Sequence, residues 1–329
     1  MWGGLIIRPF SFNGNPCFSD SAANILLQEV QWRRTLRLFL SRYNASMHKQ
    51  GLVKPVDYLA IGHLAHDLTA DGPRLGGTVA YAALTARALG MKVGIVTAVG
   101  TEAPLDVFND IPVVSMDSPQ STTFENIYTQ EGRVQYLRAQ ATRIDFKRVP
   151  EPWRSAAIIH LGPIAEDMDS IVPDELSPVL LGITPQGWMR RWGTDGRVSL
   201  RNWENAEAVL KKAGAVVISR EDVNGNHELI EYFAHQTRML VVTEGAEGCI
   251  LHWHGDRRRF RAPEVNEVDA TGAGDVFAAA FFIRLHATRD PWEAARFATL
   301  LASRSVTRVG LDGIPTPQEI EECKMEVLQ

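Results

Sequence analysis

The sequence predicts an α/β protein: a doubly wound, mostly parallel sheet with helices on both faces. Short apolar runs of strand length alternate along the chain with segments of helical periodicity, a pattern typical of parallel sheets with crossover helices. The strands are predicted at residues 58–61, 92–99, 156–161, 215–218 and 239–243, and the helices at 77–89, 203–212 and 226–236. Residues 122–128 and 133–138 instead alternate with period two around a Glu-Gly pair, which predicts a β-hairpin outside that sheet.

Several predicted strands are followed by glycine or polar residues. Asp67 lies shortly after the first strand, and Gly100, Gly162 and Ser219 each follow a later one. In open parallel sheets, ligands bind beyond the carboxyl ends of the strands. We therefore expect these four residues to lie at one edge of the sheet.

The run Asp-Ala-Thr-Gly-Ala-Gly-Asp, residues 269–275, precedes an apolar stretch that ends at Leu285. Its small residues let backbone N–H groups approach a ligand, and a helix starting here points its positive dipole end at the same place. Asp275 at the helix start is placed to accept a proton from an attacking hydroxyl, the role of a positioned carboxylate in kinases. We interpret the run as an anion hole with a base at its rim; the alternative is a tight turn capped by an aspartate.

Two common nucleotide-binding motifs do not explain this run. Phe277 stands where a dinucleotide fingerprint has its third glycine, and the sequence contains no Gly-x-x-x-x-Gly-Lys-[Ser/Thr]. Phosphate binding here must therefore use another design.

Length and composition fit one α/β domain. The chain has 329 residues, of which 45% are hydrophobic and 22% charged, as in ordinary globular proteins. A net charge of −5 argues against nucleic acid or an anionic membrane as the main partner. Cys17, Cys249 and Cys323 are odd in number and far apart, so no disulfide framework is expected, and a reducing cytoplasmic location fits best.

Residues 1–50 differ from the rest. They contain six basic and two acidic residues and an amphipathic-looking stretch at 25–43. We expect an N-terminal extension, either disordered or translated ahead of a working start at Met47, with a targeting presequence or partner helix as the alternative. The domain proper is then expected at 51–329.

The motifs together resemble the PfkB (ribokinase-like) carbohydrate kinase family. The run at 269–275 is similar to its C-terminal signature, and Gly76-Gly77 before an Ala-rich helix and a strand ending at Gly100 is similar to its N-terminal one. Residues 243–248, Thr-Glu-Gly-Ala-Glu-Gly, resemble its Thr-x-Gly-x-x-Gly nucleotide segment. The resemblance spans residues 56–318 and implies a ribokinase-like fold, with the hairpin near 120–140 acting as a small β lid over the sugar rather than a plain edge hairpin.

The resemblance also implies roles for individual residues. Asp275 matches the catalytic base, and the Gly272, Ala273 and Gly274 backbone matches the anion hole. Asp67 matches the residue that holds substrate hydroxyls, and Gly76 and Gly77 match the glycines beside the sugar. The remaining matches are Thr243, Gly245 and Gly248 in the nucleotide segment and Asp269 near a nucleotide and monovalent-cation (K⁺) loop. The implied cofactors are ATP and Mg²⁺.

Two positions depart from the family pattern. Tyr81 stands where many sugar kinases have an asparagine, which makes ribose or fructose specificity doubtful. Ser219-Arg220-Glu221-Asp222 replaces the Asn-x-x-Glu of the magnesium and phosphate shell, so the carboxylate is supplied by Asp222 or Glu221 and the amide is missing. This combination resembles the myo-inositol kinase branch.

The predicted activity is transfer of the ATP γ-phosphoryl group to a hydroxyl of a small sugar or polyol. The alternatives are a nucleoside (adenosine-like) kinase, in which Tyr81 packs against a base, and a ligand-binding protein without turnover. Besides the small-molecule substrate and ATP, a homodimer formed through the lid is expected.

Histidines with metal-like spacing are interpreted as loop and surface residues, with contact of His63 or His66 to the substrate as the alternative. His63 and His66, and likewise His252 and His254, have no third and fourth ligand nearby in the sequence. The three arginines at 257–259 are predicted to form a solvated hairpin tip between two strands.

Overall fold

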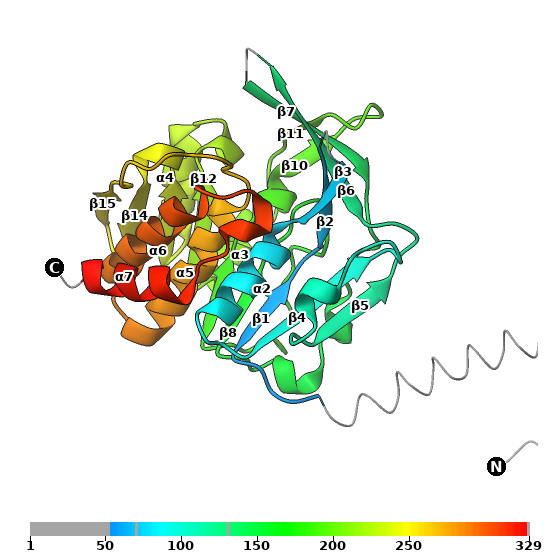
Figure 1. The fold of residues 1–329 in the computed structure, drawn as a ribbon, viewed down its shortest axis with the longest axis horizontal. Coiled ribbons are helices and arrows are strands. Elements are labelled where there is room, and N and C mark those ends of the chain that lie inside the picture. Colours follow the sequence, from blue (N-terminus) through cyan, green and yellow to red (C-terminus); the bar gives the residue numbers. More distant parts are fainter. Residues whose placement is uncertain (1–52, 70–71, 130–131, 328–329) are drawn as a thin grey trace, which may run out of the picture. The chain divides into compact units, whose positions relative to one another are not determined.

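The central element is a nine-stranded sheet within the described part of the chain, which comprises residues 53–69, 72–129 and 132–327 of a computed structural model (Figure 1). The strand order is β15-β14-β13-β12-β9-β8-β1-β4-β5. The strands are β1 (Tyr58–Ile61), β4 (Val93–Val99), β5 (Val113–Asp117), β8 (Ile158–Leu161), β9 (Leu180–Ile183), β12 (Ala215–Ser219), β13 (Met239–Thr243), β14 (Cys249–Trp253) and β15 (Asp256–Phe260). The residues from Lys54 onward form one compact unit, and the predicted extension at 1–50 lies outside the described residues.

The neighbouring strands β13, β12, β9, β8, β1, β4 and β5 run parallel to one another. Strands β14 and β15 are added antiparallel at the β13 edge of the sheet. The central strands are apolar throughout, and every residue of β1, β4, β8 and β9 is buried. Such continuous apolar runs are expected where a strand is covered on both faces. The five strands predicted from the sequence are confirmed, each to within two residues.

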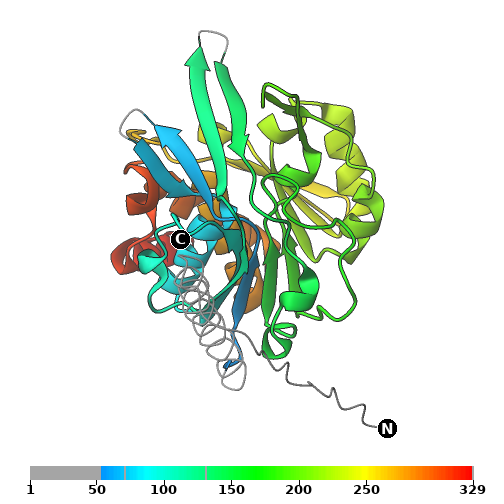
Figure 2. The ribbon, with the colours of Figure 1, turned by 90° about the vertical axis from the view of Figure 1, so that its right-hand side faces the viewer.

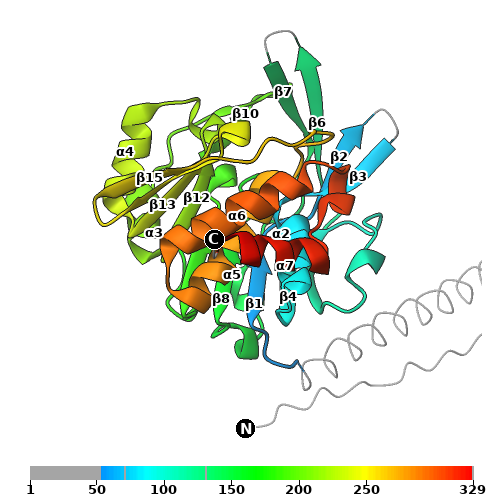
Figure 3. The same cartoon turned by 60° about the vertical axis from the view of Figure 1, so that its left-hand side comes forward.

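Helices cover both faces of this sheet, as predicted. On one face lie α2 (Thr78–Ala88), α5 (Ala273–Thr288), α6 (Pro291–Ser305) and α7 (Pro317–Val327) (Figure 3). On the other lie α3 (Ala206–Lys212) and α4 (His227–Gln236) (Figure 2). Helix α3 begins three residues later than predicted, because Trp203, which contributed to the apolar periodicity, stacks on Trp188 from the preceding loop. No helix of the described residues has the length and apolar composition that a membrane crossing needs.

A separate four-stranded sheet projects beyond the carboxyl ends of the parallel strands (Figures 1 and 2). Its order is β3-β2-β6-β7, with β2 (Ala65–Thr69), β3 (Gly72–Gly76), β6 (Thr122–Thr129) and β7 (Gly132–Ala139). We call it the lid. The predicted hairpin is confirmed as β6–β7, but it forms only half of the lid: β2 and β3 supply the other half, pairing through parallel β2 and β6.

One further expectation is corrected. The three arginines at 257–259 lie within β15, paired with β14, and the hairpin turn is formed instead by His254 and Gly255, both at positive φ. The turn sits there because Gly255 adopts a left-handed conformation freely. A short antiparallel pair, β10 (Arg190–Trp192) and β11 (Val198–Leu200), was not predicted.

Candidate active site

The first turn of α5 lies at the carboxyl edge of the sheet and carries Asp275. The helix is apolar on nearly all sides, and its residues from Val276 to Ile283 are buried in the core, so its start is firmly anchored. Gly272 precedes it in a left-handed conformation, φ +79°, which a residue with a Cβ rarely adopts. The chain can therefore turn sharply into the helix at this residue.

Two backbone N–H groups of the predicted anion hole are open. Ala273 N–H donates to the Ala270 carbonyl, and Asp275 N–H donates to the Gly272 carbonyl. No backbone hydrogen bond within the described chain uses the N–H of Gly272 or Gly274. A Cβ at Gly274 would meet no atom within 4 Å, so space is open in front of this helix end. An exposed helix N-terminus with unpaired donors attracts anions.

Asp275 is half-buried and surrounded by charged groups. Burial raises its pKa to about 6, and the negative charges of Asp222 and Asp67 act in the same direction. A hydrogen bond from the Thr78 side chain and the charge of Arg190 lower the pKa. A carboxylate that titrates near neutrality is suited to accept a proton from a substrate hydroxyl.

Gly76 and Gly77 connect the lid to α2 and lie against other parts of the site. A Cβ at Gly76 would overlap the Asp67 carboxylate, and one at Gly77, where φ is +87°, would lie 3.0 Å from the His63 carbonyl oxygen. Gly76 thus leaves room for a carboxylate of the protein itself. Asp67 lies on lid strand β2, directly opposite Arg74 of β3.

Tyr81, one turn into α2, packs against the start of α5. Its side chain is 3% exposed, and a Cβ at Gly272 would overlap its ring. Burial raises the pKa of its hydroxyl well above the usual range, and the charge of Asp275 acts in the same direction. The ring therefore supports the anion-hole loop and is not open for stacking on a ligand.

The ends of β12 and β13 bring Ser219 and Thr243 side by side, since they are register partners. Asp222 accepts hydrogen bonds from the Ser219 N–H (2.8 Å) and from the Gln186 amide (2.6 Å). Gln186 lies beyond β9, in the turn Gln186–Met189. An amide therefore stands beside this carboxylate although the Ser219 position lacks one. Glu221 is exposed.

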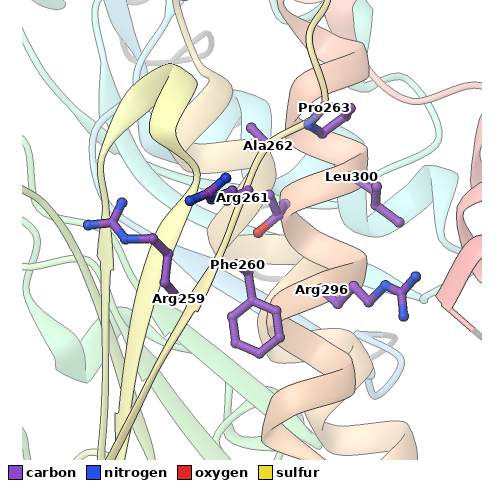
Figure 4. A pocket seen from close by; sticks show the side chains of 8 residues that line it. Arg259, Phe260, Arg261, Ala262, Pro263, Arg296 and Leu300 are labelled. Atoms are coloured by element: carbon purple, nitrogen blue, oxygen red, sulfur yellow. The ribbon is translucent and has the colours of Figure 1, made fainter.

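The glycines of residues 243–248 differ in their surroundings. Gly245, at φ +57°, has no atom within 4 Å of a built Cβ, whereas a Cβ at Gly248 would overlap the Phe260 carbonyl oxygen. Beside Phe260 a pocket of about 360 Å³ opens between the end of β15 and α6 (Figure 4). It is lined by Arg259, Phe260, Arg261, Ala262, Pro263, Arg296, Thr299 and Leu300.

Asp269 joins two loops. Its Oδ1 accepts the Thr271 N–H and its Oδ2 accepts the Gly310 N–H, both at 2.9 Å. Burial acts to raise the pKa of Asp269, but these hydrogen bonds hold it below its usual value. Asp269 thereby fixes the loop in front of α5.

Residues 201–318 match the sequence profile described as pfkB family carbohydrate kinase. This matched region belongs to the PfkB (ribokinase-like) family, and the described part of the chain has the ribokinase-like fold. The chain is accordingly a sugar or nucleoside kinase of that family, a phosphotransferase.

Individual PfkB relatives differ in their acceptors. The chain is 25% identical over 245 residues to a cytidine kinase of Thermococcus kodakarensis, covering 69% of this chain and 87% of the relative. It is 36% identical over 87 residues to an inositol 3-kinase of Oryza sativa subsp. japonica, covering 26% and 21%. In fold it is similar to a pyrophosphate-dependent kinase in the ribokinase family, with a TM-score of 0.65, 22% identity, and coverage of 80% of this chain and 99% of the other.

Sequence reasoning missed three residues of the PfkB site: Thr78, Gln186 and Arg190. Arg190 is half-buried; its guanidinium donates to the Ile164 carbonyl (3.1 Å) and lies over the ring of lid residue Phe124. Only the fold brings these residues near Asp275 and Asp222, although Thr78 directly follows the di-glycine and could have been noticed there.

The expectation that His63 and His66 are loop and surface residues is wrong in part. His63 does lie in the loop between β1 and β2, but it is fully buried, and His66 lies in strand β2 and is 9% exposed. The His63 ring is enclosed and hydrogen-bonded to Thr122 and Thr142.

The residues present fit a Mg²⁺ site that the protein shares with substrate phosphates and water, rather than one formed by protein ligands alone. Among the described residues, no group of three or more His, Cys, Asp or Glu is placed to hold a metal ion. Mg²⁺ in kinases commonly binds one or two carboxylates plus water and substrate phosphates. Half-buried Asp222 fits that arrangement, whereas K⁺ near Asp269 stays a prediction.

Proposed function

We propose that this protein transfers a phosphoryl group from a polyphosphate donor to a hydroxyl of a small polyol, with Asp275 as the general base. The observation that carries the proposal is the half-buried Asp275, with its pKa near 6, beside the open N–H groups of Gly272 and Gly274. Base and anion donors thus lie on one helix turn, as an in-line displacement on phosphorus requires.

In the proposed reaction, Asp67 on the lid orients the acceptor and Asp275 removes the proton of the attacking hydroxyl. The Gly272 and Gly274 N–H groups, together with the α5 dipole, stabilise the charge on the transferring phosphoryl oxygens. The Arg190 guanidinium supplies positive charge among the carboxylates around the site. Mg²⁺ bound to the donor phosphates would neutralise further negative charge, with Asp222 as its ligand on the protein.

We propose ATP as the donor, because the 360 Å³ pocket abuts the Gly245–Gly248 segment and offers apolar and guanidinium surface to a base. Thr243, Gly245 and Gly248 would then bind the nucleotide. The structurally similar kinase named above is pyrophosphate-dependent, and pyrophosphate is therefore the donor to test against ATP.

A cyclic polyol of the myo-inositol class is the proposed acceptor. The structurally similar kinase was solved with myo-inositol, and one curated relative is an inositol 3-kinase. A nucleoside acceptor is the second candidate because of the cytidine kinase relative. However, the buried Tyr81 ring cannot stack on a base. The sequence argument for a nucleoside acceptor, which depended on that stacking, is therefore lost.

The test is phosphoryl transfer by the purified protein with ATP or pyrophosphate, crossed with a panel of polyols, sugars and nucleosides. We expect turnover with ATP and a polyol, reduced about 10²–10⁴-fold in Asp275→Asn. Leu300→Trp, which fills the pocket, should raise the KM for ATP and leave any pyrophosphate reaction unchanged. Transfer only to nucleosides would refute the polyol proposal, and donor binding without any transfer would support the non-catalytic alternative.

A homodimer through the lid remains part of the proposal. Leu68 on β2 and Ile127 on β6 are 37% and 41% exposed, as suits strands that meet a second copy. Sedimentation of the wild type and of a Leu68→Lys, Ile127→Lys double variant tests it; equal masses for both would refute it.

A further inference from the structure

His63 lies where the lid joins the rest of the molecule. Four segments make that connection: the one entering β2, the one leaving β3, the one entering β6 and the one leaving β7. His63 itself belongs to the first of these segments, between β1 and β2. Its carbonyl oxygen lies against Gly77, in the segment that leaves β3, where a Cβ would approach to 3.0 Å.

The His63 ring reaches the two remaining segments. Nε2 lies 3.0 Å from the Thr142 carbonyl oxygen after β7, and Nδ1 lies 2.8 Å from the Thr122 hydroxyl at the start of β6. The carbonyl can only accept, so Nε2 carries the proton. In the neutral ring with its proton on Nε2, Nδ1 can only accept, so the Thr122 hydroxyl donates to Nδ1 while its oxygen accepts the Ala141 N–H. Every polar atom of the ring is therefore used, and all four connections meet at this residue.

Asp167, beyond β8, fixes His63 to the main body. Its Oδ2 accepts the His63 N–H at 2.6 Å, and its Oδ1 accepts the N–H groups of Ile164 and Ala165. Both His63 and Asp167 are fully buried. A buried group that loses its partner destabilises the structure far more than an exposed one, so each of these bonds helps to tie the base of the lid to the main body.

We propose that His63 is a positioning residue that joins the base of the lid to the main body and thereby places Asp67 for the acceptor. Asp67 is four residues further along the same strand segment, so a tilt of β2 at its base moves this carboxylate directly. This role of His63 depends on the proposed function in one respect only: Asp67 is assumed to be the group that binds the acceptor. A misplacement of the order of 1 Å is enough to weaken such a contact strongly.

The experiment compares His63→Gln and Thr122→Val with His160→Gln. His160 is a matched control: it is also buried, with its ring between the Tyr58 hydroxyl (2.7 Å) and the Thr184 hydroxyl (3.0 Å), but none of these three residues belongs to the lid or its connections. Thr122→Ser, which keeps the hydroxyl, is the conservative variant. The readouts are acceptor KM, donor KM, and amide hydrogen exchange across β2 and β6 without any substrate.

We expect His63→Gln and Thr122→Val to raise the acceptor KM about ten-fold or more, with the donor KM within about two-fold, and to speed exchange in β2 and β6 about ten-fold. Thr122→Ser should restore both values. His160→Gln should speed exchange in β1 and β8 instead and leave the acceptor KM unchanged.

Equal loss of acceptor and donor binding, or unchanged exchange in β2 and β6, would overturn the proposal. If the wild type transfers no phosphoryl group to any acceptor, the proposed function fails, and hydrogen exchange alone still decides whether His63 holds the lid.

Discussion

The glycines on the acceptor side of the site and those on the donor side serve different purposes. On the acceptor side, Cβ atoms at Gly76 and Gly272 would overlap Asp67 and Tyr81, so these glycines make room for the protein's own side chains. On the donor side, Gly248 also has no room for a Cβ, which would overlap the Phe260 carbonyl oxygen, but Cβ atoms at Gly245 and Gly274 would meet nothing within 4 Å. The first pair satisfies packing, and the second leaves space for a ligand.

The difference shows that one signature motif can combine two physical requirements. In residues 269–275, Gly272 is needed for its left-handed φ and for the Tyr81 ring, whereas Gly274 lies in a regular helix turn where alanine is sterically acceptable. A glycine at a position where the fold does not require one fits the proposed approach of a ligand to the backbone there.

The largest expected effect is at Asp275, on the boundary between the two sides. Asp275→Asn keeps the size of the side chain but removes the base, so kcat should fall about 10²–10⁴-fold. Steady-state kinetics with the accepted donor and acceptor measure this, and binding of each ligand by calorimetry is the control. Retention of wild-type kcat would mean that Asp275 is not the base.

The glycine comparison is sharpened by Gly272→Ala and Gly274→Ala. Gly272→Ala should lower the free energy of unfolding by about 2–4 kcal/mol, from the left-handed φ and the overlap with Tyr81. Gly274→Ala should raise it by about 0.5–1 kcal/mol, because alanine favours the helix, yet should raise the donor KM. Denaturant unfolding and kinetics measure the two quantities; a stable, fully active Gly272→Ala would break the distinction.

The pH dependence tests the surroundings of Asp275. With its pKa near 6, activity should fall about ten-fold per pH unit below pH 6, as the base becomes protonated. The folded-state pKa lies above the ordinary value of 3.8, so the folded protein binds the proton more tightly than the unfolded chain. This group's contribution to stability is therefore fully present below pH 3.8 and is lost as the pH rises through 6.

Asp275→Asn removes that dependence. The variant should therefore unfold at a higher temperature than the wild type at pH 7.5, and the gap should narrow at pH 4. Thermal unfolding at the two pH values measures both. A variant less stable than the wild type at pH 7.5 would show that the carboxylate stabilises the fold there.

The smallest expected effect is at Thr78, whose hydrogen bond lowers the pKa of Asp275. Thr78→Val should move the acid limb of the pH–rate profile upward from about pH 6, and Thr78→Ser should restore it. Thr85→Val in the same helix is the control, since the buried Thr85 hydroxyl has no hydrogen-bond partner among the described residues, and this variant should leave the profile unchanged. If the acid limb of the pH–rate profile did not move in Thr78→Val, Thr78 would not influence the pKa of the base.

The main sheet could be predicted because its strands are covered on both faces and therefore consist of continuous apolar residues. The first half of the lid could not. Strand β3 reads Gly-Pro-Arg-Leu-Gly, residue types that are depleted in strands, and it pairs only because β2 lies beside it.

The residues of the candidate site also fall into those that the sequence could predict and those that it could not. Asp275 and its glycines are adjacent in the chain, so the motif reveals them together. Arg190 and Gln186 reach the site from a turn beyond β9, some 85 residues before Asp275, and no local pattern marks them. The burial of His63 could not be predicted, because its ring partners, Thr122 and Thr142, come 59 and 79 residues later in the sequence.

The contact between Tyr81 and Gly272 has a consequence for recombination between relatives. These residues lie 191 positions apart and occupy one another's space, so neither can change without regard to the other. A chimera with a crossover anywhere between them inherits the ring from one parent and the turn beneath it from the other. Such hybrids should fold only when both parents share this aromatic–glycine pair, and the two signature motifs are best transplanted as a unit.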